Sequence, residues 1–368
     1  AAAAGDVPSW PELEALLPSS AAPEPRVIDS TLDPKRPKLE GLVLFRERNG
    51  WCPYSERVWL AMELKGLQYT TVLVDNMGQR ASWIGGTTPQ VRWPSGLSQG
   101  ESLDIVRKLD AEYPDTPRLW PSDDVTALVD AFRATFPRGT RPSSRAAFLF
   151  KGYAGQPVWR SEFEATLDGT DELLGRHGGP FFFGDTVSAA DCAWAPFLER
   201  YAFQLPCLHA GLNPRDAERW PRLAAWYDAM DREVPAYACR VKGDATSWRR
   251  VLAQAGFGNA GVAPVLVEGG GAPPRDGAPS AAHQAATQSA WAAYAQERAH
   301  VAATPHEEAA ARVVRNRRAI AADAVARGAV TEAEVDEALR EVAALLARGG
   351  AAPRAAPEGL APTRWLAE

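Results

Sequence analysis

The sequence predicts an α/β domain, followed by an all-α domain and then by a helical C-terminal extension. A strand-helix-strand pattern lies between residues 41 and 75. Residues 122–258 have helical spacing of apolar side chains and no strand pattern. Residues 281–349 are rich in Ala, Glu and Arg and nearly free of Gly and Pro, which is typical of helices. The chain of 368 residues exceeds what one hydrophobic core usually serves, so we expect two or three folded units.

The composition excludes several classes of function. Hydrophobic residues make up 46% of the chain and charged residues 23%, which is typical of a folded globular protein. The net charge of −6 leaves no overall positive field, so we expect no nucleic-acid binding. The apolar stretches are shorter than the roughly 20 residues that span a bilayer, so we expect no transmembrane segment. The scattered Cys and His residues and the lack of a Gly-rich phosphate loop predict no disulfide framework, no metal and no nucleotide.

Proline and glycine mark the ends of the folded parts. Residues 1–38 hold seven prolines and predict an extended arm that wraps the surface. Residues 259–280 are rich in Gly, Pro and Ala and predict a linker, and residues 351–368 form a C-terminal tail. The chain begins AAAAGDVPSW without Met, which is consistent with removal of a targeting segment.

Residues 281–350 predict a separate helical module. Thr304-Pro305 and Gly328 interrupt the helical pattern and divide it into three helices. Each helix has apolar residues at spacings of three and four: Trp291 and Tyr294; Val313, Val314 and Ile320; Val335, Leu339, Val342 and Leu346. Three short Ala-rich helices bury little area, so we expect them to pack on the rest of the chain or on another protein.

Cys52 lies at a predicted strand-to-helix turn. The apolar run LVLF precedes it, helical spacing of apolar residues follows it, and QYTTVLV then restores strand character. Pro53 suits the first helical position, where its missing N–H costs nothing. The Cys52 sulfur is therefore expected at a helix N-terminus, where the dipole and the free N–H groups favour the nucleophilic thiolate. The alternative is a buried structural cysteine.

Cys52-Pro53-Tyr54-Ser55 resembles the active site of monothiol glutaredoxins and glutathione transferases. The resemblance implies a thioredoxin-like glutathione-binding domain over residues 39–115, with Pro53 and Tyr54 in the glutathione site. Ser55 stands where dithiol enzymes carry a resolving cysteine, so no intramolecular disulfide can form across this turn. An external thiol must then resolve the mixed disulfide, and glutathione is the obvious one.

Two further pairs of residues extend the resemblance. In the thioredoxin-like fold a cis-proline places its neighbour's backbone beside the catalytic sulfur, which implies this role for Thr88 and Pro89, although most X-Pro bonds are trans. Glu101 and Ser102 match the acid-Ser pair that holds the γ-glutamyl end of glutathione at a helix N-terminus; the alternative is a plain N-cap. Arg80 lies where related transferases carry a cation for the glycyl carboxylate, and the alternative there is an exposed arginine.

The helical half carries a structural signal. Ser188-Ala189-Ala190-Asp191 predicts a capping box that begins a helix. The same form, with Asp at the last position, begins a buried helix in glutathione transferases, which implies an all-helical transferase domain over residues 122–258. The remaining cysteines are interpreted as packing residues: Cys192, Cys207 and Cys239.

The sequence TTPQVRWPSGLSQGES, a cysteine site and a long extension are most similar to the iota class of photosynthetic organisms, with the omega, lambda and dehydroascorbate-reductase classes next. This implies a chloroplast location, or otherwise a cytoplasmic one. A cysteine nucleophile forms a mixed disulfide with glutathione. The expected function is therefore glutathione-dependent thiol transfer or deglutathionylation, with glutathione as co-substrate and a small electrophile or glutathionylated molecule as acceptor. The alternative is a transferase-like scaffold without significant catalysis, whose extension docks a protein partner in a larger chloroplast assembly.

Overall fold

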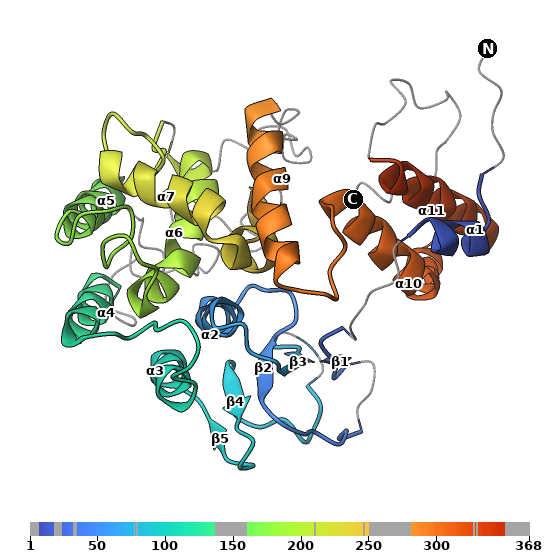
Figure 1. Ribbon diagram of the computed structural model, residues 1–368, viewed down its shortest axis with the longest axis horizontal. Coiled ribbons are helices and arrows are strands. Elements are labelled where there is room, and N and C mark those ends of the chain that lie inside the picture. The colour runs from blue at the N-terminus through green and yellow to red at the C-terminus, as the bar shows by residue number, and fades with distance from the viewer. Residues whose placement is uncertain are drawn as a thin grey trace. The chain divides into compact units, whose positions relative to one another are not determined.

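The computed structural model describes residues 7–17, 24–31, 35–76, 78, 80–136, 160–209, 211–245, 247–249, 281–326, 328 and 330–349. The chain divides into two compact units, one of residues 25–284 and the other of residues 1–24 and 285–368 (Figure 1). The predicted linker at 259–280 and the predicted tail at 351–368 lie outside the described residues.

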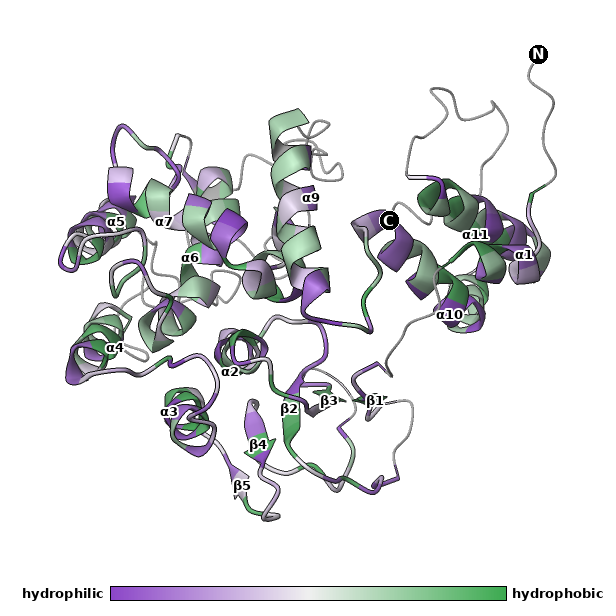
Figure 2. Cartoon of the chain, viewed as in Figure 1, coloured by the Kyte–Doolittle hydropathy of each residue, from purple (hydrophilic) through white to green (hydrophobic). Residues whose placement is uncertain are grey.

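A five-stranded sheet forms the first half of the larger unit. Its strands are β1 (Val27–Asp29), β2 (Val43–Glu47), β3 (Thr70–Val74), β4 (Gln90–Arg92) and β5 (Ser98–Gln99). Their order in space is β1-β3-β2-β4-β5, with β1, β3 and β2 parallel and β4 and β5 antiparallel to their neighbours. This topology confirms the predicted thioredoxin-like domain. Figure 2 shows that the central strand β2 is largely hydrophobic, as expected of a strand covered on both faces.

Helices α2 (Pro53–Leu64) and α3 (Ser102–Glu112) accompany the sheet. Their buried residues, such as Val58 and Ile105, belong to the main hydrophobic core. A second, smaller cluster contains Val43 and Val72, whose side chains leave neighbouring strands. In the chain, helix α2 lies between the parallel strands β2 and β3. Its first residue, Pro53, directly follows Cys52.

The second half of this unit is all-helical, as predicted. It contains α4 (Asp123–Thr135), α5 (Arg160–Leu174), α6 (Ala189–Leu208), α7 (Pro221–Glu233) and the π-helix η2 (Tyr237–Val241). Both α2 and α3 pack against α6. Buried aromatic residues of the helical half and apolar residues of α2 and α3 form one continuous core. This shared core fixes the cysteine-bearing domain against the helical domain.

A capping box begins α6. Ser188 is the N-cap, and its hydroxyl accepts a hydrogen bond from the Ala190 N–H at 3.2 Å. One carboxylate oxygen of Asp191 accepts from the Ser188 N–H at 2.9 Å. The other accepts from the Trp226 indole at 2.9 Å and from the Phe182 N–H at 3.2 Å. Burial raises the pKa of Asp191, and this one carboxylate joins the start of α6 to the preceding loop and to α7.

The smaller unit contains helices from both ends of the chain. Its helices are α1 (Trp10–Leu16), α10 (Pro305–Ala326) and α11 (Glu332–Ala347), and α9 (Ala281–Gln296) spans the boundary between the units. The helices break at Pro305 and near Gly328, as the sequence predicted. Figure 2 shows hydrophobic and hydrophilic residues on both α10 and α11, and the buried ones include Val314, Val335 and Leu339. No described helix is both long enough and apolar enough to cross a bilayer.

The predicted extended arm differs from the structure. Ser9 and Glu12 form a capping box that begins α1, and Pro11 lies in its first turn, where proline is tolerated. Leu13 of α1 is buried against α10 and α11, and the Trp10 indole donates to Asp336 at 2.7 Å. Residues 27–29 add strand β1 to the sheet. Of the described prolines, Pro8 and Pro11 therefore lie at the start of α1, and Pro25 lies two residues before β1.

Candidate functional site

Cys52 occupies the N-cap of α2 with extended backbone, and Pro53 is the first helical residue. Its half-buried thiol donates a hydrogen bond to the Thr88 carbonyl at a sulfur-to-oxygen distance of 3.5 Å. The Thr88-Pro89 peptide bond is cis. The loop before β4 thus places a backbone carbonyl beside the sulfur, at the end of α2 where N–H groups lack helical partners.

The loop that leads into Cys52 is held from both domains. The Glu47 carboxylate of β2 accepts from the N–H groups of Asn49 and Trp51 at 2.9 and 2.7 Å. Arg200 of α6 donates to the carbonyls of Gly50 and Trp51 at 3.4 and 3.2 Å. Both Glu47 and Arg200 are buried, so the position of the thiol depends on the packing of the two domains.

Arg200 also lies in a buried charged network. Its guanidinium is 2.8 Å from the Glu56 carboxylate of α2. Burial and the neighbouring Glu199 raise the pKa of Glu56 well above its usual range, and the charge of Arg200 opposes that rise. Glu199 accepts in turn from the Gly243 N–H at 2.8 Å and from the Tyr237 hydroxyl at 3.2 Å. The network ties the first turns of α2 to the end of the helical domain.

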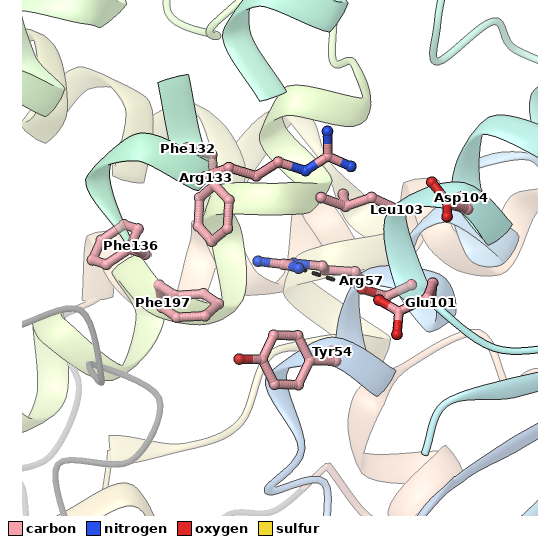
Figure 3. Close-up of a pocket in the computed structure, with 10 residues that line it drawn as sticks. Tyr54, Arg57, Glu101, Leu103, Asp104, Phe132, Arg133, Phe136 and Phe197 are labelled. Atoms are coloured by element: carbon pink, nitrogen blue, oxygen red, sulfur yellow. Dashed lines mark hydrogen bonds between the residues drawn. The ribbon is translucent and has the colours of Figure 1, made fainter. Parts of the chain in front are cut away.

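A cavity of about 280 Å³ lies beside the first turns of α2 and α3 (Figure 3). Tyr54, Glu101 and Ser102 line it, together with aromatic residues of α4 and α6. Glu101 has φ of +61°, which a non-glycine residue rarely adopts, at a cost of about 1–3 kcal/mol. It is the N-cap of α3 but provides no side-chain cap, and Ser102 is the first helical residue. The N-terminus of α3 therefore faces the cavity without a side-chain cap.

Arg57 lines this cavity and lies between the rings of Tyr54, Phe132 and Phe197 (Figure 3). Its guanidinium carbon is 5.2, 4.4 and 5.2 Å from the three ring centroids, within the range of cation–π attraction. The same group donates to the Ser102 hydroxyl at 3.3 Å. A buried cation thus lies next to Ser102, and both belong to the cavity wall.

The structure brings the sequence-predicted residues together in two groups. Cys52 and Thr88 are in contact, with Pro53 and Pro89 adjacent to them in the chain. Tyr54, Glu101 and Ser102 share the cavity. Arg80 belongs to neither group: it lies in the segment between β3 and β4 and donates to the Gly85 carbonyl at 3.3 Å.

The other cysteines differ from Cys52 in position. Cys192 and Cys207 are buried, Cys239 is half-buried, and all four cysteines are free thiols. Burial raises the pKa of Cys192. Ser55, at the place of a resolving cysteine, is buried in the first turn of α2. Of the four thiols, Cys52 alone lies at a helix N-cap beside a cis-proline loop.

Sequence reasoning missed Arg57, Glu47 and Arg200. Arg57 follows Pro53 by one helical turn, a spacing that places both on one side of α2. That spacing does not reveal that aromatic rings of α4 and α6 enclose the guanidinium.

Among the described residues, no three His, Cys, Asp or Glu side chains are grouped so that they could bind a metal ion. The arrangement offers a thiol at a helix N-cap, a backbone carbonyl beside it and a second helix N-terminus suited to a carboxylate.

Comparisons with known proteins agree with this geometry. Residues 51–112 match the family model of the glutathione S-transferase N-terminal domain, and residues 124–229 match that of the C-terminal domain. Glutathione S-transferase L1 of Arabidopsis thaliana is 30% identical over 50% of this chain and 76% of its own length. Pyrimidodiazepine synthase of Drosophila melanogaster is 30% identical over 51% of this chain and 76% of its own. Glutathione S-transferase L2, chloroplastic, of Arabidopsis thaliana is 28% identical over 50% and 62%.

Proposed function

The chain belongs to the glutathione S-transferase family, and from this premise we propose that it is a glutathione-dependent thiol transferase whose nucleophile is Cys52. The observation that carries the proposal is the Cys52 sulfur at the N-cap of α2, 3.5 Å from the carbonyl that precedes cis-Pro89. A hydroxyl at this place would stabilise the thiolate of glutathione. A cysteine thiolate instead attacks sulfur and forms a mixed disulfide.

The proposed reaction has two exchange steps. The Cys52 thiolate attacks the glutathione sulfur of a glutathionylated acceptor, so that a Cys52–glutathione disulfide forms and the acceptor sulfur leaves as a thiolate that takes up a proton. A second glutathione, as thiolate, then attacks the glutathione sulfur on Cys52. Oxidised glutathione leaves and the Cys52 thiolate returns. One free glutathione is consumed: it leaves as oxidised glutathione together with the glutathionyl group of the acceptor, and the acceptor sulfur is reduced to a thiol.

The glutathione site is proposed to use both groups of residues. The backbone beside Pro89 would pair with the cysteinyl part of glutathione, and Thr88 contacts Cys52 directly. Glu101, Ser102 and the N-terminus of α3 would hold the γ-glutamyl end, because a helix N-terminus favours a carboxylate. Pro53 and Tyr54 would form the adjoining wall on α2, and Arg80 would supply the cation for the glycyl carboxylate.

Replacing Ser102 by alanine is expected to raise the KM for glutathione roughly tenfold, because a hydrogen bond to a charged group contributes about 1.5–3 kcal/mol. The rate at saturating glutathione should change little, since Ser102 is proposed to bind glutathione and not to take part in the exchange of sulfur bonds. Steady-state kinetics of thiol transfer measure both constants. Ser98→Ala, at an exposed position on β5, is the matched control. A KM for glutathione equal to that of the control would remove Ser102 from the site.

The activity itself is tested by comparing two reactions of the full chain. We expect glutathione-dependent release of thiol from a glutathionylated peptide to be much faster than conjugation of glutathione to chlorodinitrobenzene, because sulfur is the proposed target of Cys52. Conjugation that exceeds thiol transfer would point to a conventional transferase mechanism and overturn the proposal.

A second candidate function rests on the separate helical unit. Residues of both chain ends form that unit, which favours a docking role for the region predicted as the 281–350 extension. In this account the chain is a transferase-like subunit that recruits or joins a larger assembly through a protein partner. Catalysis by Cys52 and docking by this unit are compatible with each other.

A chain reduced to residues 25–262 tests whether catalysis belongs to the larger unit alone and docking to the smaller one. Thiol-transfer kinetics are expected to stay nearly unchanged, because all proposed glutathione-binding residues lie in the larger unit. Both ends must be removed together, since Leu13 and Trp10 of α1 pack against α10 and α11. Kinetics and size-exclusion chromatography of the two chains provide the comparison. Loss of glutathione binding or of folding in the shorter chain would assign the removed segments to the catalytic core.

The class and location of the protein are also proposals. The iota-class assignment stays a prediction, because the Arabidopsis relatives are named only glutathione S-transferase L1 and L2. The name of L2 includes the word chloroplastic, which supports a chloroplast location for this chain.

A further inference from the structure

A second cavity of about 280 Å³ is lined in part by the loop that leads into Cys52. Its wall combines residues of β2 and of that loop with residues 240–248 of the helical domain. Four cationic side chains line it: Arg46, Arg48, Arg240 and Lys242. Asp244 is the one acidic residue among the described lining residues. The cavity shares no described lining residue with the cavity around Arg57.

Most charges around this cavity already have partners. Arg48 pairs with Asp29, Arg240 with Glu63 and Lys242 with Asp231, at nitrogen-to-oxygen distances of 3.2, 3.7 and 2.6 Å. The Asp244 carboxylate accepts from the N–H and the hydroxyl of Ser247. The part of the chain that the structure describes provides no ion pair for Arg46.

The surroundings of Arg46 disfavour its positive charge, because its guanidinium is partly buried and lies near that of Arg240. Its guanidinium lies 4.3 Å from the ring centroid of Trp59, and the guanidinium of Arg240 lies 5.6 Å from the same centroid. The Arg46 Nε atom is buried without a hydrogen-bond partner, while another nitrogen of the group donates to the Glu47 carbonyl at 3.1 Å. Burial lowers the pKa of Arg46 to about 10, and the charge of Arg240 contributes to that shift. An anion in contact with both guanidinium groups would offset the cost of burial and the repulsion between the two charges.

Trp59 contacts two of the four cations that line the cavity, the guanidinium groups of Arg46 and Arg240. The ring of Trp248 instead contacts Arg200, which does not line the cavity. The Trp59 ring limits the freedom of the Arg46 and Arg240 side chains, which lowers the entropy lost when an anion binds. The wall is therefore a preorganised site for negative charge.

We propose that this cavity, here called the Arg46 cavity, binds a phosphate monoester, with its phosphate between Arg46 and Arg240. Guanidinium groups match the oxygen atoms of phosphate with parallel hydrogen bonds, and a phosphate group offers enough oxygens for two arginines. The volume exceeds that of inorganic phosphate and leaves room for a small esterified group. The site is separate from the proposed glutathione site and does not depend on it.

The Arg46 cavity borders the loop that precedes Cys52. Asn49, Gly50 and Trp51 line the cavity, and Cys52 is the next residue. The same three residues take part in the hydrogen bonds of Glu47 and Arg200 described above. A bound phosphate monoester would therefore contact the loop that sets the position of the thiol.

Calorimetric titration and thermal unfolding of the full chain test this inference, with phenyl phosphate as the probe at constant ionic strength. Phenyl phosphate is expected to bind with a single site and to raise the Tm as its concentration increases. Arg46→Met and Arg240→Met should each weaken binding about tenfold or more, since each removes charge-assisted hydrogen bonds. Arg232→Met, at an exposed arginine of α7, is the matched control and should bind as the unaltered chain does.

Three further titrations, with glutathione, succinate and inorganic phosphate, test the specificity of the site. Saturating glutathione should leave the affinity for phenyl phosphate unchanged, and succinate and inorganic phosphate should bind more weakly than phenyl phosphate. The proposal is overturned if the Arg240→Met chain binds phenyl phosphate as tightly as the control does. Displacement of the probe by glutathione, or tighter binding of succinate, would equally contradict it.

Discussion

Replacing Cys52 by serine is expected to lower the rate of thiol transfer by roughly 10³-fold or more, because removal of a covalent nucleophile eliminates the reacting atom. Folding and glutathione affinity should change little. The proposed binding groups lie elsewhere, on the backbone beside Pro89 and at the start of α3, and serine preserves the size of the side chain at the N-cap, where it is a favoured residue. A weak gain in conjugating activity is also expected, since a hydroxyl there could stabilise the thiolate of glutathione.

Cys239→Ser is the matched control, because Cys239 is the other cysteine that is only half-buried. It should retain the activity of the unaltered chain. Rates of glutathione-dependent reduction of a glutathionylated peptide, with glutathione affinity measured by calorimetry, separate a chemical defect from a binding defect. Undiminished thiol transfer by the Cys52→Ser chain would refute the assignment of the nucleophile.

Replacing Asp191 by alanine is expected to lower the free energy of unfolding by about 3–5 kcal/mol, since several buried donors lose their acceptor at once. The donors are the backbone N–H groups of Ser188 and Phe182 and the indole of Trp226. All lie in the interior, where bulk water is not available to replace the carboxylate as hydrogen-bond acceptor. Ser188→Ala removes only the N-cap hydroxyl and should cost about 1 kcal/mol.

Urea unfolding followed by circular dichroism measures both values, with Asp228→Ala at an exposed site on α7 as control. The control is expected to change the free energy of unfolding by about 0.5 kcal/mol or less. A loss below about 1 kcal/mol for Asp191→Ala would mean that the capping box contributes little to the fold.

The parts of the fold with local signals could be predicted from the sequence. Pro53 after Cys52 indicates the start of α2, and Ser188 with Asp191 indicates the start of α6, because capping depends on residues a few positions apart. The breaks at Pro305 and near Gly328 are of the same kind. Helix α1 was missed because Pro11 was interpreted as a residue of an extended arm, although the capping pair Ser9 and Glu12 precedes and follows it.

The supports of the candidate site could not be predicted, because they join residues far apart in the chain. Arg200 reaches the loop before Cys52 from α6, about 150 residues later. The rings around Arg57 come from α2, α4 and α6. Such contacts depend on how the helical domain packs against the sheet domain, and no local pattern records that packing.

The central claim is that Cys52 forms a mixed disulfide with glutathione. Mass spectrometry of the full chain after treatment with oxidised glutathione, followed by peptide mapping, tests this most directly. The account predicts one glutathione adduct, located on Cys52 and removed by excess reduced glutathione, because this thiol lies at a helix N-terminus and is only half-buried. An adduct found only on Cys192, Cys207 or Cys239, with Cys52 unmodified, would contradict it.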